Sequence, residues 1–349
     1  MIDNIKSILI INEGFSDNIG DQAIKESMEY LVNSELKCKY SFEDLSRYNK
    51  IHLNYDVATY TKKNSKIKPP NLFKTWILRF LWVINNFYRL KNACQKNDYA
   101  IIGGGQLLLA NNIFPFEIFI WTLFLNLYKV KYSFFSVGTQ GDFSKSDLFF
   151  LSYSLKHAKK IFVRDKLSKT LIKSNFDLKA CLTYDTAFVY NSVINSQNFN
   201  SDKRVLLGIV DIKVYNSYNS VNVNSDNYNE KWYDLIKNYD IKKVNLFYST
   251  KEDRFQCLSF QSYIHEKLKY KIPILENSKT EEFIKNLLLA NLIISGRMHS
   301  LILAKTLNIN YETFLISKKL IEFERIYKNL KNDDIVDDIK IKFKSILQF

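Results

Sequence analysis

Apolar strands alternate with amphipathic helices along most of the chain. The first apolar run, Ser7–Ile11, leads into a polar loop at 12–20 and a helical pattern at 21–32. The same order then recurs several times. Further strands are predicted at 98–102, 132–137, 160–163 and 180–182, and further helices at 115–128, 148–155 and 167–173. Short apolar strands separated by amphipathic helices predict parallel βαβ units.

An Asn- and Ser-rich stretch at 191–203 interrupts this pattern and is the best candidate for a domain boundary. A second series of predicted strands follows at 205–210, 244–248, 272–275, 292–294 and 311–315, with a helical tail from 318. The polar segment 210–229 predicts a long loop or a mobile lid. We therefore expect an α/β protein with two Rossmann-like domains, 1–195 and 196–349, and a cleft between them.

Residues 71–90 break the alternation, because they are rich in apolar and aromatic side chains and are flanked by lysine and arginine. Arg79 and the Asn85-Asn86 pair argue against a transmembrane span. Two interpretations stay open. The segment is either a packing element of the core or an interfacial helix, with Trp and Phe in the lipid headgroup region and cations around them.

The composition favours anionic partners. The chain has 349 residues and a formal net charge of +14, and 46% of its residues are hydrophobic. Its lysines are scattered, so a phosphorylated ligand or an anionic membrane surface is a better partner than nucleic acid. The four cysteines show no CxxC spacing, and no paired carboxylates suggest a metal site, so we expect no metal. The sequence predicts a reduced, cytoplasmic protein without a signal peptide.

The most informative motif follows the predicted strand at 292–294. A Ser295-Gly296 turn leads into a helix whose first turn carries Arg297, His299 and Ser300. Helix N-termini attract anions, because their first amides lack partners within the helix. The chain has nine glycines, and nearly all of them stand at the end of an apolar run. The motif therefore predicts a phosphate or carboxylate ligand.

Several short motifs, each after a predicted strand, resemble those of the polysaccharide pyruvyl transferases. The resemblance runs from Asn18 to about Lys319. In chain order the motifs are Asn18-Ile19-Gly20-Asp21, the stretch from Asp98 to Gly103-Gly104-Gly105, Gly138, Val163-Arg164-Asp165 with Ser168, Asp185, and Gly296-Arg297-Met298-His299-Ser300.

This resemblance implies a GT-B-like pair of Rossmann domains. It also implies transfer of pyruvate from phosphoenolpyruvate to two hydroxyls of a sugar, which gives a ketal in capsule or exopolysaccharide biosynthesis. Phosphoenolpyruvate is the donor substrate, and no cofactor is expected. The implied acceptor is a saccharide linked to a polyprenyl diphosphate. Such an acceptor would place the enzyme peripherally at the inner membrane face.

Phosphoenolpyruvate carries a phosphate and a carboxylate, so its binding requires at least two cationic anchors. Arginine suits both anions because its guanidinium pairs with either in a bidentate way. Arg164 and Arg297 follow strands of opposite predicted domains and could clamp the ligand from two sides. We expect the phosphate at Arg297, His299 and Ser300, with Lys319 within reach of the same anion.

The reaction also needs a general acid and a general base. His299 is the expected titrating group, since imidazole titrates near neutrality. Asp21 and Asp185 are candidate bases, although a helix-start carboxylate and a turn aspartate are equally good interpretations of them. A close-approach surface for the acceptor is expected from the backbone at Asn18, Gly20, Gly103, Gly104, Gly105 and Gly138.

Two other functions are compatible with the sequence. A GT-B glycosyltransferase that uses a nucleotide sugar would share the cleft and a basic diphosphate site. A non-catalytic relative that binds an anionic glycan is also permitted by the composition. The co-occurrence of Arg164, Arg297 and His299 argues against the non-catalytic relative. A glycosyltransferase would be favoured by a carboxylate after a strand of the second domain, placed to hold ribose hydroxyls, and the sequence offers no clear candidate for it.

Overall fold

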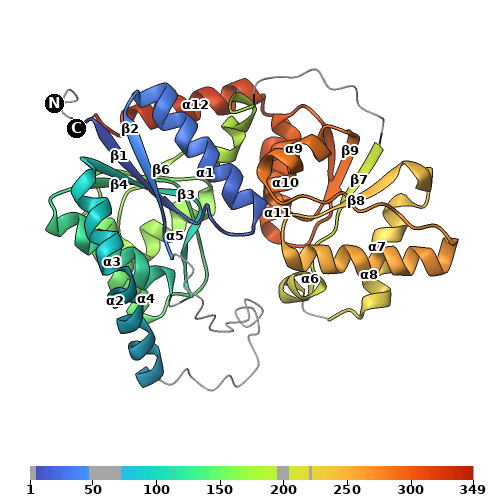
Figure 1. Ribbon diagram of the computed structural model, residues 1–349, viewed down its shortest axis with the longest axis horizontal. Helices are drawn as coiled ribbons and strands as arrows, with labels where there is room; N and C mark the ends of the chain where they lie inside the picture. Colours follow the sequence, from blue (N-terminus) through green and yellow to red (C-terminus); the bar gives the residue numbers. More distant parts are fainter. Residues whose placement is uncertain (1–4, 47–71, 112, 195–203, 220–221, 349) are drawn as a thin grey trace.

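A computed structural model describes residues 5–46, 72–111, 113–194, 204–219 and 222–348. Within them the chain forms two parallel sheets that lie side by side (Figure 1). The first sheet has the order β2-β1-β3-β4-β5-β6, and the second has the order β10-β9-β7-β8. Their strands are β1 (Ser7–Asn12), β2 (Lys39–Asp44), β3 (Tyr99–Leu109), β4 (Lys131–Gln140), β5 (Ile161–Val163), β6 (Cys181–Leu182), β7 (Arg204–Gly208), β8 (Val244–Phe247), β9 (Ala290–Ser295) and β10 (Asn310–Thr313).

Helices connect successive strands and cover both sheets. The helices are α1 (Ile19–Leu31), the π-helical turn η1 (Val32–Leu36), α2 (Leu72–Lys96), α3 (Phe114–Leu127), α4 (Lys145–Lys156), α5 (Lys166–Phe176), the 3-10 helix η3 (Thr186–Ser192), α6 (Ile212–Tyr218), α7 (Ser225–Ile236), the 3-10 turn η4 (Ile241–Lys243), α8 (Lys251–Leu268), α9 (Thr280–Leu287), α10 (Met298–Thr306), α11 (Lys318–Tyr327) and α12 (Asn332–Ser345).

Strand β1 shows why the first sheet is central to the fold. Ile8, Leu9, Ile10 and Ile11 are all fully buried, because successive side chains point to opposite faces and both faces are covered. Leu9 and Ile11 pack with apolar residues of α2, α3 and α4. Ile8 and Ile10 pack with residues of α1 and of the C-terminal helices. The predicted parallel α/β architecture with two Rossmann-like units is therefore confirmed.

Each sheet has a point where the strand order reverses. The chain passes from β1 to β2 on one side and then to β3 on the other, and β7 lies in the same way between β8 and β9. Open parallel sheets bind ligands beyond the carboxyl ends of their strands at such points. The start of α1 after β1 carries Asp21, and the turn after β9 carries Arg297, so both residues occupy favourable places for a site.

The two halves of the chain pack against each other near these loops. The backbone N–H of Ile19 donates to the carbonyl oxygen of Ser249 at 3.0 Å. The hydroxyl of Thr280 lies 3.3 Å from Oε1 of Gln22. An apolar cluster also joins residues of α1, such as Ile19, to residues of β8 and α9. The start of α1 is thus fixed against the second half.

Three predicted elements differ in the structure. The strand expected to end before the glycine triplet continues through it to Leu109, with an irregular register after Gly105. The strand expected at 272–275 is reduced to one parallel bridge between Ile274 and Leu246. The loop or lid expected at 210–229 is mostly helical, because α6 and the start of α7 occupy it. Strand β2 was not predicted, because its residues are mainly polar and half of them are exposed.

The helical tail lies against the first sheet, although its position in the chain groups it with the second domain. Helix α12 crosses back over the first half (Figure 1). Its buried residues Ile335, Ile339 and Phe343 share one apolar cluster with β1 and β3. The ring of Phe343 meets the ring of Phe135 edge to face, with centroids 4.9 Å apart. Burial of this apolar stripe decides where the tail packs.

Candidate functional site

Arg164 and Asp185 form a buried ion pair at the carboxyl edge of the first sheet. Arg164 directly follows β5, and Asp185 caps the helix η3 that follows β6. Nη1 of Arg164 donates to Oδ2 of Asp185 at 2.6 Å, and both residues are buried. Gly138 of β4 leaves room for the guanidinium, because a Cβ there would lie 2.7 Å from Nε of Arg164. The arginine is therefore held in one place by a glycine beside it and a carboxylate at its tip.

His299 comes to this pair from the second half of the chain. It lies in the first turn of α10, and its ring packs on the backbone of Gly20 in α1. A Cβ at Gly20 would lie 2.3 Å from Nδ1 of His299, so glycine is required for this approach. Nε2 of His299 is 3.6 Å from Oδ2 of Asp185 and has no hydrogen-bond partner among the described residues. The structure thus joins three predicted site residues, Arg164, Asp185 and His299.

Asp185 is ionised in this arrangement. Burial alone would raise its pKa, but Arg164 and His299 outweigh burial and hold the pKa of Asp185 well below its usual range. Oδ1 also accepts from the backbone N–H of Ala187 at 3.0 Å. A carboxylate with a low pKa is a weak general base. These contacts suit a residue that orients Arg164 and His299.

Asp21 is the second carboxylate of the cluster. It lies in the first turn of α1, and its Oδ2 accepts from the hydroxyl of Ser16 at 3.0 Å. Burial raises the pKa of Asp21, and the nearby charges of His299 and Arg164 partly offset that rise. Asn18 caps α1 by accepting from the N–H of Gly20 at 2.9 Å, which fixes the start of the helix. A carboxyl with a raised pKa at this place suits proton transfer better than Asp185 does.

Lys319 brings a further cation from the first turn of α11. Burial, followed by the charge of Arg164, lowers the pKa of Lys319 to about 7, while Asp165 acts in the opposite direction. Asp165 itself caps α5 by accepting from the N–H of Ser168 at 2.6 Å. Its other oxygen is 3.9 Å from Nε of Arg164. Lys319 therefore belongs to the same electrostatic cluster as Arg164.

Arg297 makes different contacts from those expected. Its guanidinium forms a bidentate pair with Asp253, at 2.9 Å from Nε to Oδ2 and 2.6 Å from Nη2 to Oδ1. Asp253 is fully buried in the first turn of α8 and also accepts from the N–H of Asp211 at 2.9 Å. Arg297 thus ties together loops of the second sheet, and its role as a phosphate ligand stays a prediction. Ser300 lies one turn further on, and its Oγ is buried without a partner among the described residues.

The glycine triplet brings the backbone of β3 close to its neighbours. Gly104 has a φ of +69°, and a Cβ there would lie 2.3 Å from Cγ2 of Ile24 in α1. The same Cβ would lie 3.1 Å from Oγ1 of Thr186, a buried hydroxyl without a partner among the described residues. The triplet therefore lies beside the start of η3, where Asp185 is located. A contact of Gly103 and Gly105 with an acceptor stays a prediction.

A second group of carboxyls, missed in the sequence, lies beyond the end of β1. The hydroxyl of Ser46 is 2.8 Å from Oε1 of Glu13 and 2.6 Å from Oε2 of Glu117. One hydroxyl proton cannot serve both acceptors, so the arrangement favours the protonated form of one of the two carboxyls. Burial accordingly raises the pKa of Glu117 to about 7 and the pKa of Glu13 well above its usual value. Glu13 and Glu117 stand far apart in the chain, so no spacing could reveal their proximity.

The partner of Arg297 was also missed, although a sequence signal exists for it. Thr250 caps α8 and accepts from the N–H of Asp253 at 3.3 Å. This Thr-x-x-Asp spacing after an apolar strand is the pattern of a helix start. It places an acidic side chain in the first turn of α8, at the same sheet edge as Arg297.

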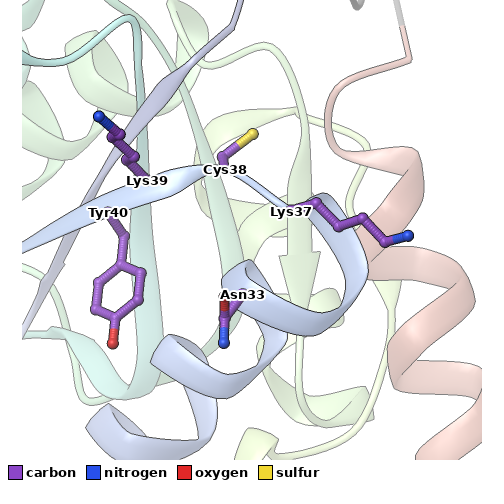
Figure 2. Close-up of a pocket in the computed structure, with 5 residues that line it drawn as sticks. All are labelled: Asn33, Lys37, Cys38, Lys39 and Tyr40. Carbon is purple, nitrogen blue, oxygen red and sulfur yellow. The ribbon is translucent and has the colours of Figure 1, made fainter.

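Metal-binding groups and surface hollows are the other features that could mark a site in the described part of the chain. In the residues that the structure describes, no group of three His, Cys, Asp or Glu side chains could hold a metal ion. A shallow hollow lies at the start of β2 (Figure 2) and is lined by Asn33, Lys37, Cys38, Lys39 and Tyr40. It is at the amino end of the strand, whereas Arg164, Asp185 and His299 follow carboxyl ends. This hollow is therefore separate from the cluster.

Solved structures of low sequence identity share the fold. The UDP-GlcNAc 2-epimerase from Methanocaldococcus jannaschii in complex with UDP-GlcNAc and UDP matches 99% of this chain and 93% of its own, with 14% identity and a TM-score of 0.53. A putative UDP-N-acetylglucosamine 2-epimerase from Listeria monocytogenes matches 99% and 91%, with 10% identity and a TM-score of 0.53. The UDP-N-acetylglucosamine 2-epimerase from Rickettsia bellii matches 99% and 96%, with 9% identity and a TM-score of 0.51.

These likenesses confirm the predicted GT-B-like fold. No curated protein matches the chain. The family model described as polysaccharide pyruvyl transferase matches residues 18–310, which include nearly all the predicted site residues, with Lys319 just beyond. On this evidence, the chain belongs to the polysaccharide pyruvyl transferase family.

Proposed function

We propose that this protein transfers the pyruvyl group of phosphoenolpyruvate to two hydroxyls of a sugar and forms a pyruvate ketal. The observation that carries the proposal is the meeting of His299 from the second half with the Arg164–Asp185 pair of the first half. Nε2 of His299 and Oγ of Ser300 are buried, and neither has a partner among the described residues. Buried polar atoms without partners cost free energy, so they support a site that a polar ligand completes.

The proposed ligand fits the charges of this cluster. Arg164 and Lys319 supply two cations for the phosphate and carboxylate of phosphoenolpyruvate, and the first amides of α10 add hydrogen-bond donors. Asp185 holds Arg164 and His299 in position. Arg297 stays a proposed phosphate ligand, and to bind it must share or leave its contact with Asp253.

The proposed reaction has two steps. In the first, a sugar hydroxyl attacks C2 of the enol while C3 gains a proton, and the hydroxyl loses its proton to a base. In the second, the bond from C2 to the phosphate oxygen breaks, and the second hydroxyl attacks C2 and loses its proton to the departing phosphate. The products are the ketal and inorganic phosphate. We assign the delivery of the C3 proton to His299 and the removal of a hydroxyl proton to Asp21, whose pKa burial raises.

The biological setting is proposed with the reaction. The acceptor is a saccharide linked to a polyprenyl diphosphate, in the biosynthesis of a capsule or exopolysaccharide. The protein then works in the cytoplasm, peripherally at the inner face of the membrane. Among the described helices, none is long and apolar enough to cross a membrane. No cofactor or metal is part of this proposal.

A ligand screen by thermal shift tests the donor. We expect phosphoenolpyruvate to raise the Tm of the wild type, and we expect UDP-sugars to leave it unchanged. Stabilisation by a nucleotide sugar, without any by phosphoenolpyruvate, would instead support a GT-B glycosyltransferase. Binding of phosphoenolpyruvate without any phosphate release on a panel of lipid-linked saccharides would support a non-catalytic relative.

A substitution at His299 tests the acid. We expect His299→Gln to keep the wild-type Tm and to lower phosphate release from phosphoenolpyruvate by roughly 100-fold or more, the size typical of a lost proton-transfer group. The matched control is His265→Gln, at a histidine near the end of α8 outside the cluster. Phosphate release at the wild-type rate by His299→Gln would assign His299 a structural role.

A further inference from the structure

Helix α2 carries a continuous apolar stripe that faces away from the protein. Trp76, Ile77, Phe80, Leu81, Ile84, Phe87 and Tyr88 are all exposed, with Phe80 at 65% and Tyr88 at 75%. Their spacing of one, three and four residues places them along one side of the helix. The opposite side of α2 packs in the core through residues such as Trp82, Val83 and Leu90. The core-packing interpretation of this segment is therefore confirmed for one side of the helix, and the interfacial interpretation stays a prediction for the exposed side.

Neighbouring helices extend this surface. Leu123 and Leu127 of α3 are 40% and 70% exposed, and Phe149 of α4 is 65% exposed. Ring contacts connect the three helices, from Phe87 to Phe124 and from Phe119 to Phe149. We call the exposed apolar side chains of α2, α3 and α4 the aromatic face. Contiguous apolar surfaces of this kind mark sites of interaction with a partner or a membrane.

The charges around the aromatic face favour an anionic partner. The three helices contain two carboxylates, Glu117 and Asp147, and these are only 4% and 1% exposed. Exposed lysines lie at both ends of the helices: Lys145 is at the carboxyl edge of the sheet, and Lys96, Lys129 and Lys156 are at the amino edge. A second copy of the chain would bring two basic surfaces together, which is unfavourable. An anionic lipid surface satisfies both the apolar side chains and the lysines.

The position of the aromatic face also fits a membrane. Nε1 of Trp82 donates to the carbonyl oxygen of Ser46, just beyond the carboxyl end of β2. The turns of α2 that precede Trp82 therefore extend past this edge of the sheet, which also carries Arg164 and Asp185, and Figure 1 shows them projecting beyond the sheet. Trp76 and Phe80 lie on these projecting turns. A lipid surface that contacts them would lie on the site side of the sheet.

We propose that the aromatic face docks the protein on an anionic phospholipid bilayer, with Trp76, Phe80 and Ile84 inserted among the headgroups. This inference deepens the proposed function, since it names the surface that would bring the site to a lipid-linked acceptor. Docking itself requires neither donor nor acceptor. Vesicle binding and pyruvyl transfer are therefore measured separately, and either result can fail without the other.

Cosedimentation with vesicles tests the docking. We expect the wild type to sediment with vesicles of phosphatidylcholine and phosphatidylglycerol at low salt, less so at high salt, and weakly with phosphatidylcholine alone. The variant Trp76→Ser/Phe80→Ser/Ile84→Ser should bind about tenfold more weakly or worse, because it removes apolar surface from the contact. Trp82 is left unchanged because it packs in the core and donates to Ser46.

The control variant is Phe255→Ser/Leu258→Ser/Leu268→Ser, which changes three exposed apolar residues of α8 in the second half. It should bind vesicles like the wild type. Tryptophan fluorescence gives a second readout, since Trp121 and Trp232 are fully buried while Trp76 is 55% exposed. We expect a blue shift with anionic vesicles that Trp76→Phe abolishes.

Three results would overturn the proposal. The first is that the wild type stays in the supernatant with anionic vesicles at low salt. The second is that the α2 variant binds as well as the wild type. The third is that the wild type is a dimer by sedimentation velocity, that the α2 variant is a monomer, and that neither binds vesicles. That outcome would assign the aromatic face to a second copy of the chain.

Discussion

At the scale of single residues, Lys319 ties ligand binding to pH. Burial and Arg164 lower its pKa to about 7, so the ammonium group is partly deprotonated at neutral pH. A bound phosphate or carboxylate would favour the charged form and raise this pKa. Binding of phosphoenolpyruvate must then take up a proton above pH 7. Its affinity consequently falls as pH rises beyond 7, by up to about tenfold per pH unit.

We therefore predict that calorimetry at pH 7 and pH 9 shows weaker binding of phosphoenolpyruvate at pH 9. Proton uptake should appear as a binding enthalpy that depends on the ionisation heat of the buffer. Lys319→Met should remove this uptake, while Lys328→Met, at an exposed lysine just after α11, should keep it. Equal affinity at the two pH values in the wild type would exclude Lys319 from the anion site.

The residues of the site were predicted to different extents. Arg164 and Asp185 follow strands of the first sheet, and parallel strands carry such residues to one edge, so the sequence indicated their proximity. His299 follows a strand of the second sheet, and its approach was expected only from the predicted cleft between the two domains. Arg297 shows the limit of this reasoning. Its place at the start of α10 was predicted, but the buried carboxylate of Asp253 binds its guanidinium. A helix-start pattern predicts the position of a residue in the backbone, whereas the contacts of its side chain depend on tertiary packing.

At the scale of elements, the approach of α10 to α1 depends on Gly20. A Cβ at this position would lie 2.3 Å from Nδ1 of His299 and 2.8 Å from its Cβ, so the ring or the helix would have to move. Gly20 lies at the start of α1 and has no positive φ, so alanine suits its backbone. The cost of alanine at this position therefore comes chiefly from His299, which supplies the three atoms nearest to the added Cβ.

We predict opposite effects of Gly20→Ala in two backgrounds. In the wild type it should lower the free energy of unfolding by about 1–3 kcal/mol through overpacking, and it should reduce turnover. In the His299→Gly background, which removes the Cβ of His299 as well as its ring, it should be neutral or stabilising by up to about 1 kcal/mol, because alanine favours a helix over glycine. Denaturant unfolding of the four proteins measures this coupling. Additive effects would show that Gly20 does not serve the histidine.

Elements were predicted best where strands are short and fully apolar. Tyr99–Ile102 was recognised, but its continuation through Gly103-Gly104-Gly105 was not, because glycine triplets usually end a strand. The polar segment 210–229 looked like a loop, yet Tyr228 and Trp232 give α7 a buried face. Only the packing of these two aromatic side chains in the second core reveals that face.

At the scale of the whole molecule, the end of the chain completes the core of its beginning. Phe343 of α12 is fully buried and packs against Phe135 of β4. Ile346 directly follows α12, and its carbonyl oxygen lies 3.5 Å from the hydroxyl of Tyr99 in β3. Nζ of Lys344 pairs with Glu35 of η1 at 2.8 Å. Along the chain, the second sheet therefore lies between two segments that pack on the first sheet. This connection holds the loops of the second sheet in position against the first sheet.

This packing predicts which strands lose protection from hydrogen exchange when a core residue of α12 is removed. Phe343→Ala should lower the free energy of unfolding by about 3–5 kcal/mol, as expected for a large side chain removed from a core. Hydrogen exchange should increase first in β3 and β4, which lie far from Phe343 in sequence, and less in β7 and β9. Ile341→Ala, at a residue of the same helix that is 68% exposed, should stay within about 0.5 kcal/mol of the wild type. Faster exchange confined to the second sheet would contradict this packing.

If the first sheet becomes less stable instead, Arg164 and Asp185 lose their fixed support. Phosphoenolpyruvate should then bind more weakly to Phe343→Ala, even though α12 does not touch the proposed site.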